Sequence, residues 1–109
     1  MIDRELLELA AKAAGIKFYA LSRGGARYAP QPGIMQPYVY WNPLADDGDA
    51  LRLAVRLKID VAHTNIHAPQ VHALADAKVQ VWEETKDDPD AATRRAIVRA
   101  AAEIGRSMK

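Results

Sequence analysis

The stretch KVQVWEETKDDPDAATRRAIVRAAAEIG, residues 78–105, carries the two periodicities that decide the fold class. Its first part alternates, with Val79 and Val81 on one side and Gln80 and Trp82 on the other, which is typical of a strand with one buried face. Its second part repeats small apolar residues at helical spacing, from a predicted Asp88 cap to a predicted end at Gly105. Pro89 suits the first turn of that helix. A strand joined directly to a helix in this way indicates an α+β protein.

Two earlier segments also have helical spacing. Residues 3–14 place Leu6, Leu7 and small residues opposite charged ones, with Asp3 as the expected cap and Gly15 as the expected stop. Residues 47–57 begin with acidic side chains and end with basic ones, the order that the helix dipole favours. Lys58 follows that helix where a glycine would be more comfortable, so the position of this helix end is open.

Short apolar and aromatic runs predict the strands. They cover residues 16–21, 38–41, 59–66, 70–75 and 78–84, and we expect the last three to form an antiparallel meander. The Gly- and Pro-rich residues 23–36 predict a long irregular loop, which makes this segment a candidate interaction site.

These elements predict a single α+β domain over residues 1–109. We expect an α/β sandwich of order α-β-β-α-β-β-β-α, in which a mostly antiparallel sheet is packed by three helices. Residues 106–109 are expected to fray. The small residues of the last helix permit close approach to another element, either within the fold or in another copy of the chain, and the oligomeric state is left open.

Composition excludes several function classes. Fifteen basic and fourteen acidic residues nearly cancel, so no global field draws the chain to nucleic acid or to an anionic membrane. The absence of cysteine excludes disulfides, thiol nucleophiles and cysteine-based metal sites. No apolar run approaches the roughly 20 residues that span a bilayer, and the acidic N-terminal stretch is unlike a signal peptide. We therefore expect a cytoplasmic protein without a cofactor.

The segments WNPLADDGDAL (residues 41–51), RLAVRLKIDV (52–61) and DDPDAATRRAIVRAAAEIG (87–105) resemble a known family. They are similar to the phage α/β/α (ABA) sandwich domain, a family of small NinX-like proteins encoded by bacteriophages and prophages. The resemblance implies a three-layer sandwich and a mobile-element origin. It implies no established activity and no catalytic residues.

Three histidines, His63, His67 and His72, fall within ten residues. Three imidazoles can hold zinc with an open fourth position. His63 and His67, however, straddle a predicted turn with no acidic residue between them, so we favour solvated or hydrogen-bonded turn histidines over a metal site.

Arginines of the last two helices are the candidates for phosphate contact. If both helices cover one face, Arg52 and Arg56 could join Arg95 and Arg99 in a basic strip. Nearby acidic residues favour the alternative of a solvated charged face.

Aromatic residues near the long loop are the candidates for a partner surface. In the YVYW run, Tyr40 or Trp41 must be core if the run is a strand with one buried face. Tyr28, Met35 and Tyr38 are then the residues to test for interaction.

No pattern indicates catalysis, because helix capping explains acidic pairs such as Asp46-Asp47 and Asp87-Asp88. We therefore expect a non-catalytic accessory or protein-interaction module, with a nucleic-acid-binding protein that uses the helix arginines as the alternative.

Overall fold

The computed structural model describes residues 2–21, 24–28, 38–65, 68–76 and 78–108. Along the chain, its elements are α1 (Asp3–Ala14), β1 (Phe18–Leu21), β2 (Gly24–Tyr28), β3 (Tyr38–Trp41), α2 (Asp47–Leu57), β4 (Asp60–Thr64), β5 (Gln70–Ala75), β6 (Val79–Glu84) and α3 (Pro89–Ser107).

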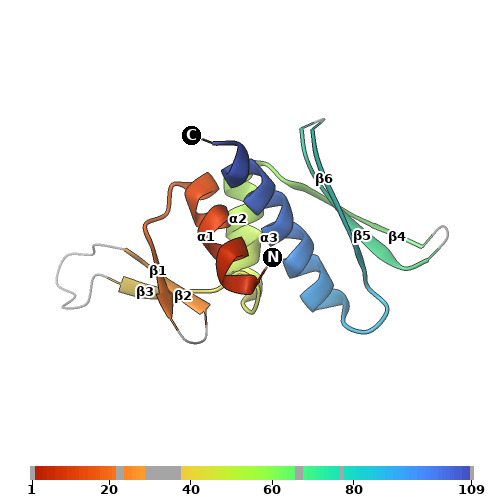
Figure 1. Ribbon diagram of the computed structural model, residues 1–109. Coiled ribbons are helices and arrows are strands. Elements are labelled where there is room, and N and C mark those ends of the chain that lie inside the picture. Colours follow the sequence, from red (N-terminus) through yellow and green to blue (C-terminus); the bar gives the residue numbers. More distant parts are fainter. Residues whose placement is uncertain (1, 22–23, 29–37, 66–67, 77, 109) are drawn as a thin grey trace.

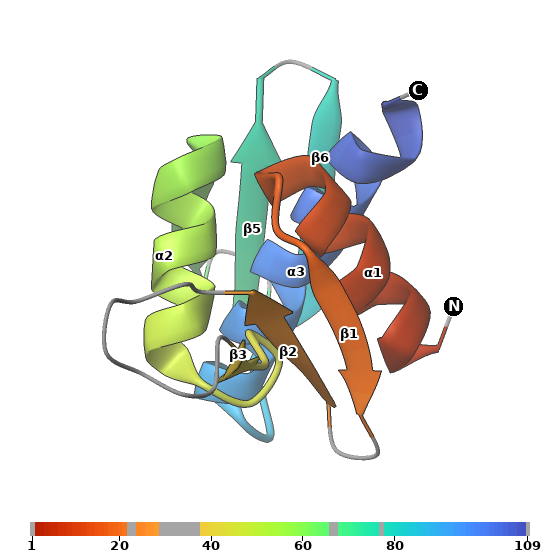
Figure 2. The ribbon, with the colours of Figure 1, turned by 90° about the vertical axis from the view of Figure 1, so that its left-hand side faces the viewer.

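The helices form a central layer between two separate sheets (Figures 1 and 2). The long helix α3 packs against α1 and α2 within this layer and against β5 and β6 on one side. On the other side, α1 contacts β1 and β2. Three layers are thus present, but in the order sheet, helices, sheet, and not in the helix, sheet, helix order that the family name implies.

Both sheets are antiparallel throughout their described pairings. One has the order β1-β2-β3 and the other β4-β5-β6, each a simple meander. The predicted α+β class, the three helices and the antiparallel pairing are confirmed. The division of the strands into two sheets was not predicted.

Strand β2 corrects the prediction of an irregular loop over residues 23–36, at least for residues 24–28. Glycine usually weakens a strand, but here Gly25 makes room for an aromatic contact. A Cβ atom at Gly25 would lie 1.9 Å from Cε2 of Phe18. The Phe18 ring meets Trp41 edge-on instead, with ring centroids 5.9 Å apart. The remaining residues of the predicted loop, 23 and 29–36, lie outside the described residues.

Helix ends follow the sequence in most places. The Asp46 carboxylate accepts from the Asp49 N–H at 2.8 Å, and the Asp88 carboxylate accepts from the Ala91 N–H at 3.0 Å, so both predicted caps are confirmed. The prediction that Asp3 caps α1 is wrong. Ile2 occupies the cap position, and its aliphatic side chain has no hydrogen-bond acceptor. The Asp3 carboxylate instead pairs with Arg95 on α3 at 3.1 Å.

The last helix continues to Ser107 and so passes the end predicted at Gly105. A Cβ atom at Gly105 would lie 2.0 Å from the Leu9 carbonyl oxygen. This glycine therefore lets α3 approach the backbone of α1 and does not end the helix. Residues 106 and 107 are helical and not frayed, which corrects the prediction for that segment.

The core is built largely from small side chains. Ala10 of α1 has no exposed surface, and the same is true of Ala96, Ala100 and Ala101 of α3. The small-residue face of α3 therefore packs within the chain, which resolves the alternative left open by the sequence. Trp41 is buried at 3% exposure and is the member of the YVYW run that belongs to the core.

Candidate functional site: the groove between α2 and β4

A groove of about 600 Å³ lies between α2, β4 and the first half of α3. The buried residues that line it are Ala50 and Ala54 of α2, Ile59 between α2 and β4, and Ile97 of α3. Its walls include further aliphatic side chains, so its chemistry is that of an apolar binding surface.

The groove exists because α3 does not reach the whole sheet. Among the strands of the second sheet, α3 packs on β5 and β6. Val61 and His63 of β4 lie opposite Ala73 and Val71 of β5 and therefore share the inner face with these two buried residues. His63 is nevertheless exposed and Val61 only half-buried. The inner face of β4 thus overhangs the groove and forms its far wall.

Two aliphatic side chains on α2 stand beside the groove in solvent. Leu51 is 64% exposed and Val55 is 70% exposed. They are four residues apart and therefore lie one above the other on the helix. Isolated exposed aliphatic residues need no explanation, but a pair that lines one groove of about 600 Å³ marks a contact surface.

The edge of β4 next to the groove is open. The Thr85 N–H donates to the Pro69 carbonyl at 3.1 Å, and these two residues continue the β5–β6 register. Because ladder bonds alternate, odd-numbered residues of β5 bond to β6 and even-numbered residues bond to β4. The β4 residues opposite those even-numbered positions are Asp60, Ala62 and Thr64. The backbone N–H and C=O groups of Val61 and His63 therefore point away from β5, and the described residues offer them no backbone partner.

Charged side chains mark the two ends of the α2 wall. Asp47 lies at the N-terminal end and forms an ion pair with Arg94 of α3 at 2.6 Å, while its side chain remains 74% exposed. Lys58 lies at the C-terminal end, is exposed, and ends α2 in the left-handed conformation with φ 56°. No ion pair of Lys58 occurs within the described part of the chain. Along α2, the groove wall therefore consists of an acidic residue, two aliphatic residues and a basic residue, in that order.

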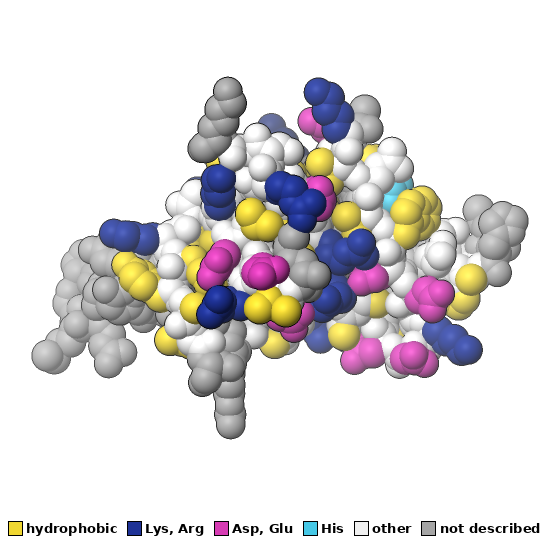
Figure 3. Space-filling view, in the orientation of Figure 1, with side chains coloured by type: hydrophobic (Ala, Val, Ile, Leu, Met, Phe, Trp, Pro, Cys, Tyr) yellow, Lys and Arg dark blue, Asp and Glu magenta, His cyan; other side chains and the backbone are white. Residues whose placement is uncertain are grey.

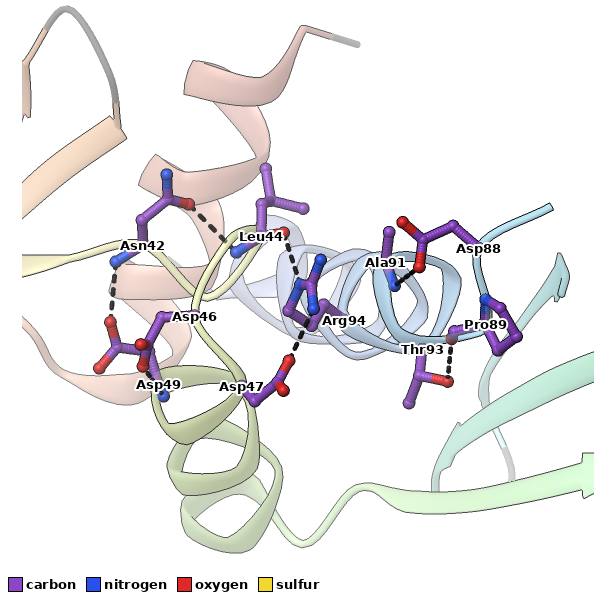
Figure 4. A network of polar contacts seen from close by, with 10 residues as sticks. All are labelled: Asn42, Leu44, Asp46, Asp47, Asp49, Asp88, Pro89, Ala91, Thr93 and Arg94. Carbon is purple, nitrogen blue, oxygen red and sulfur yellow. Dashed lines mark hydrogen bonds and ion pairs between the residues drawn. The ribbon is translucent and has the colours of Figure 1, made fainter.

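A hydrogen-bond network fixes this end of α2 against α3 (Figure 4). The buried Asp49 carboxylate accepts from the Asn42 N–H at 3.0 Å, and the Asn42 side-chain oxygen accepts from the Leu44 N–H at 3.1 Å. Arg94 then donates to the Leu44 carbonyl at 2.9 Å as well as to Asp47. The acidic and polar residues of WNPLADDGDAL are thus used to hold the turn and the helix start together.

The candidate arginines separate into two groups with different surroundings. Arg95 and Arg99 line a polar hollow with β6 and both contact Glu83, at 3.6 and 3.2 Å. Arg52 and Arg56 line another hollow beside Trp41, where Arg52 bonds to Asp49 at 2.8 Å. One continuous basic strip over both helices is therefore not formed. Figure 3 shows basic and acidic side chains interspersed over the visible face.

The histidines are also separated. His63 lies on the inner face of the second sheet, whereas His72 lies on the outer face, where its ring stacks on Trp82 with centroids 3.9 Å apart. His67 falls outside the described residues. Among the residues described, no group of three or more potential ligands is placed to hold a metal ion.

The predicted aromatic candidates fall mostly outside the description. Met35 is not among the described residues, and for Tyr28 and Tyr38 the structure gives the backbone, which pairs them directly across β2 and β3. Their neighbour Tyr40 is 55% exposed, and its hydroxyl accepts from the Asn42 side-chain amide at 3.3 Å.

Sequence reasoning missed the groove. Leu51 and Val55 have the helical spacing of a core face, so periodicity alone places them against a sheet. The available signal was the width of that face, since Leu53, Ala54 and Leu57 already supply an apolar side. When the apolar face of a helix is too wide for one neighbouring element to cover, the rest of that face can contact a second element.

Hydroxyl groups near the groove have structural partners. The Thr93 hydroxyl, the one hydroxyl among the described lining residues, donates to the Pro89 carbonyl at 2.7 Å within α3. A nucleophile held by a general base needs a different arrangement. What the groove offers chemically is apolar surface, an open strand edge and five charged residues in its described lining, namely Asp47, Lys58, Asp60, Asp90 and Arg94.

No helix in the described ranges is long and apolar enough to cross a membrane. Comparison of the chain with protein-family models, with curated proteins and with solved structures gives no significant match.

Proposed function

We propose that this protein is a non-catalytic interaction module that binds a polypeptide partner through the side of the molecule formed by α2 and β4. The observation that carries the proposal is the coincidence of exposed Leu51 and Val55 with the open edge of β4 on one apolar groove. The accessory role in a phage or prophage, implied by the family resemblance, is part of the same proposal.

Association would remove the apolar surface of this side from water. Each square ångström of apolar surface removed from water contributes roughly 25 cal/mol, and exposed Leu51 and Val55 offer that gain. An open strand edge is a template for pairing with another extended chain unless charges, a bulge or a covering element block it. The free edge positions of β4 are Val61 and His63, and neither is a Lys, Arg, Asp, Glu or Pro residue.

The ion pairs of the described residues support polypeptide binding over both catalysis and nucleic-acid binding. Asp47, a carboxylate that lines the groove, is held in an ion pair with Arg94, and the neighbouring Asp46 caps α2. The paired state of Arg95, Arg99 and Arg52 likewise gives less support to the alternative of nucleic-acid binding, because phosphate would have to compete with the protein's own carboxylates.

Native mass spectrometry of protein isolated gently from the cells that make it tests the proposal. We expect the wild-type chain to appear in a complex heavier than the bare chain. Val55→Lys should lose that complex, because a charge on the groove wall would have to be buried without a partner.

Leu21→Lys is the matched control, since Leu21 is an aliphatic residue of β1 that is 51% exposed on the other sheet. It should retain the complex. A wild-type spectrum that contains only the bare chain would contradict the proposal, as would a complex that survives Val55→Lys and disappears in Leu21→Lys.

A further inference from the structure

We infer that the partner at the α2–β4 side is a second copy of this chain, related by a two-fold axis perpendicular to the second sheet. This inference rests on the proposed function, because it names the occupant of the same surface. In the dimer, β4 pairs antiparallel with its counterpart, and α2 packs antiparallel beside its counterpart.

Charge order along α2 supports a self-complementary contact. Asp47, Leu51, Val55 and Lys58 succeed one another at helical spacing, and all four line the groove. When two such helices lie antiparallel, Leu51 of one meets Val55 of the other. Asp47 then lies beside the partner's Lys58, and the second pair of end charges matches by symmetry. The exposed Asp47 carboxylate can accept from Lys58 while it keeps its bond to Arg94.

The open edge of β4 fits the same symmetry. Centred on Ala62, an antiparallel pair of β4 strands places Val61 opposite His63 of the partner, and His63 opposite Val61. These are the residues whose N–H and C=O groups point outward, so both facing pairs exchange their hydrogen bonds. The other facing pairs are Asp60 with Thr64 and Ala62 with Ala62, so no like charges meet.

A second copy accounts for both layers at once. In the sheet, β4 is the edge strand next to β5, and Figure 2 shows α2 on the β5 side of the helix layer, away from β6. In the two-fold dimer, one interface joins the two sheets through their β4 strands and the two helix layers through their α2 helices. A single added peptide strand would satisfy the edge of β4 without supplying a charge partner for Lys58 or a helix for Leu51 and Val55. Isologous two-fold contacts of this kind are the commonest in soluble oligomers.

Disulfide trapping of the purified chain tests the inference. The sequence has no cysteine, so Ala62→Cys introduces a single thiol at the proposed axis. Ala62 would face its own copy in a non-hydrogen-bonded pair, where the two Cα atoms lie about 4.5 Å apart, within disulfide range. We expect mild oxidation to convert most of this variant to a covalent dimer. Gln80→Cys, on the exposed face of the opposite edge strand β6, should stay monomeric on the denaturing gel.

Light scattering of the unmodified chain over a dilution series gives the second readout. We expect about 24 kDa at high concentration, twice the 12.0 kDa of the chain. Lys58→Asp should raise the dissociation constant at least about tenfold, because it sets like charges together at both ends of the helix pair. Asp is tolerated at a left-handed position, so the variant should remain folded.

The outcomes separate this inference from the proposed function. A chain that is monomeric at every concentration, with Ala62→Cys no more cross-linked than Gln80→Cys, overturns the second copy. If the native complex from cells is still lost in Val55→Lys and its added mass is not that of this chain, the interaction module stands with a different partner. If that complex is also absent, both are wrong.

Discussion

Lys58 ends α2 with φ 56° and ψ 46°, a conformation that costs an ordinary L-residue roughly 1–2 kcal/mol relative to glycine. Its N–H still closes the helix end by donating to the Val55 carbonyl at 3.3 Å. Gly15 takes the same conformation after α1, with φ 70°. The two helix ends therefore have the same geometry, and only one of them has the residue that adopts it without strain.

We predict that Lys58→Gly is more stable than Lys58→Ala by about 1 kcal/mol. Both variants lose the same charge, so the difference isolates the backbone term. Chemical denaturation of the two variants at equal concentration measures it. Equal stabilities of the two variants would show that the left-handed conformation at Lys58 is not strained. For the same reason, Gly15→Ala should lower the free energy of unfolding by about 1 kcal/mol.

Gly105 lets α3 lie directly against the backbone of α1. Gly105→Ala would place its Cβ atom 2.0 Å from the Leu9 carbonyl, so the helices must move apart. We expect a loss of about 1–3 kcal/mol in the free energy of unfolding.

Gly48→Ala is the matched control for that variant. A Cβ atom at Gly48 meets the end of the flexible Arg52 side chain at 3.1 Å and the Asp46 carboxylate at 3.3 Å, so only side-chain ends must shift, by a few tenths of an ångström. Because alanine also has the higher helix propensity, Gly48→Ala should be neutral or stabilising. Thermal unfolding distinguishes the two, and equal losses would contradict the close packing.

At the scale of elements, Glu83 joins β6 to α3. Its carboxylate is 21% exposed and contacts both Arg95 and Arg99, while Arg99 also donates to the Trp82 carbonyl at 3.2 Å. The candidate phosphate-binding arginines are thus part of the contact between a sheet and a helix.

Removing these arginines should therefore affect stability more than nucleic-acid affinity. We predict that Arg95→Ala combined with Arg99→Ala lowers the free energy of unfolding by about 1 kcal/mol, a value kept small because both arginines are 41% exposed. Arg4→Ala, which breaks an exposed pair with Glu8, should cost less. A salt-dependent loss of affinity for nucleic acid in the double variant, with unchanged stability, would instead favour the nucleic-acid alternative.

Elements whose signals are local were predictable from the sequence. The alternation of residues 79–84, the Asp88 cap with Pro89, and the acidic start of α2 gave correct elements. Strand β2 was not predictable, because Gly24 and Gly25 indicate a loop unless the Phe18 ring that covers Gly25 is known. The Asp3 cap failed for a similar reason, since its partner Arg95 is distant in sequence.

At the scale of the whole molecule, the candidate site depends on relations that no short segment contains. Leu51 and Val55 have the pattern of a buried face, and only the extent of α3 under the second sheet determines that they stay exposed. The open edge of β4 follows from strand order, which local periodicity does not specify. The fold class was therefore available from sequence, while the groove required the arrangement of the layers.

The central claim is that association closes the α2–β4 side of the molecule, and amide hydrogen exchange along β4 tests it most directly. In the associated wild-type species, we expect the Val61 and His63 amides to exchange as slowly as that of Ala62, which bonds to β5. In Val55→Lys, the Val61 and His63 amides should become fast while Ala62 stays protected. Fast exchange at Val61 and His63 in both proteins would contradict the claim.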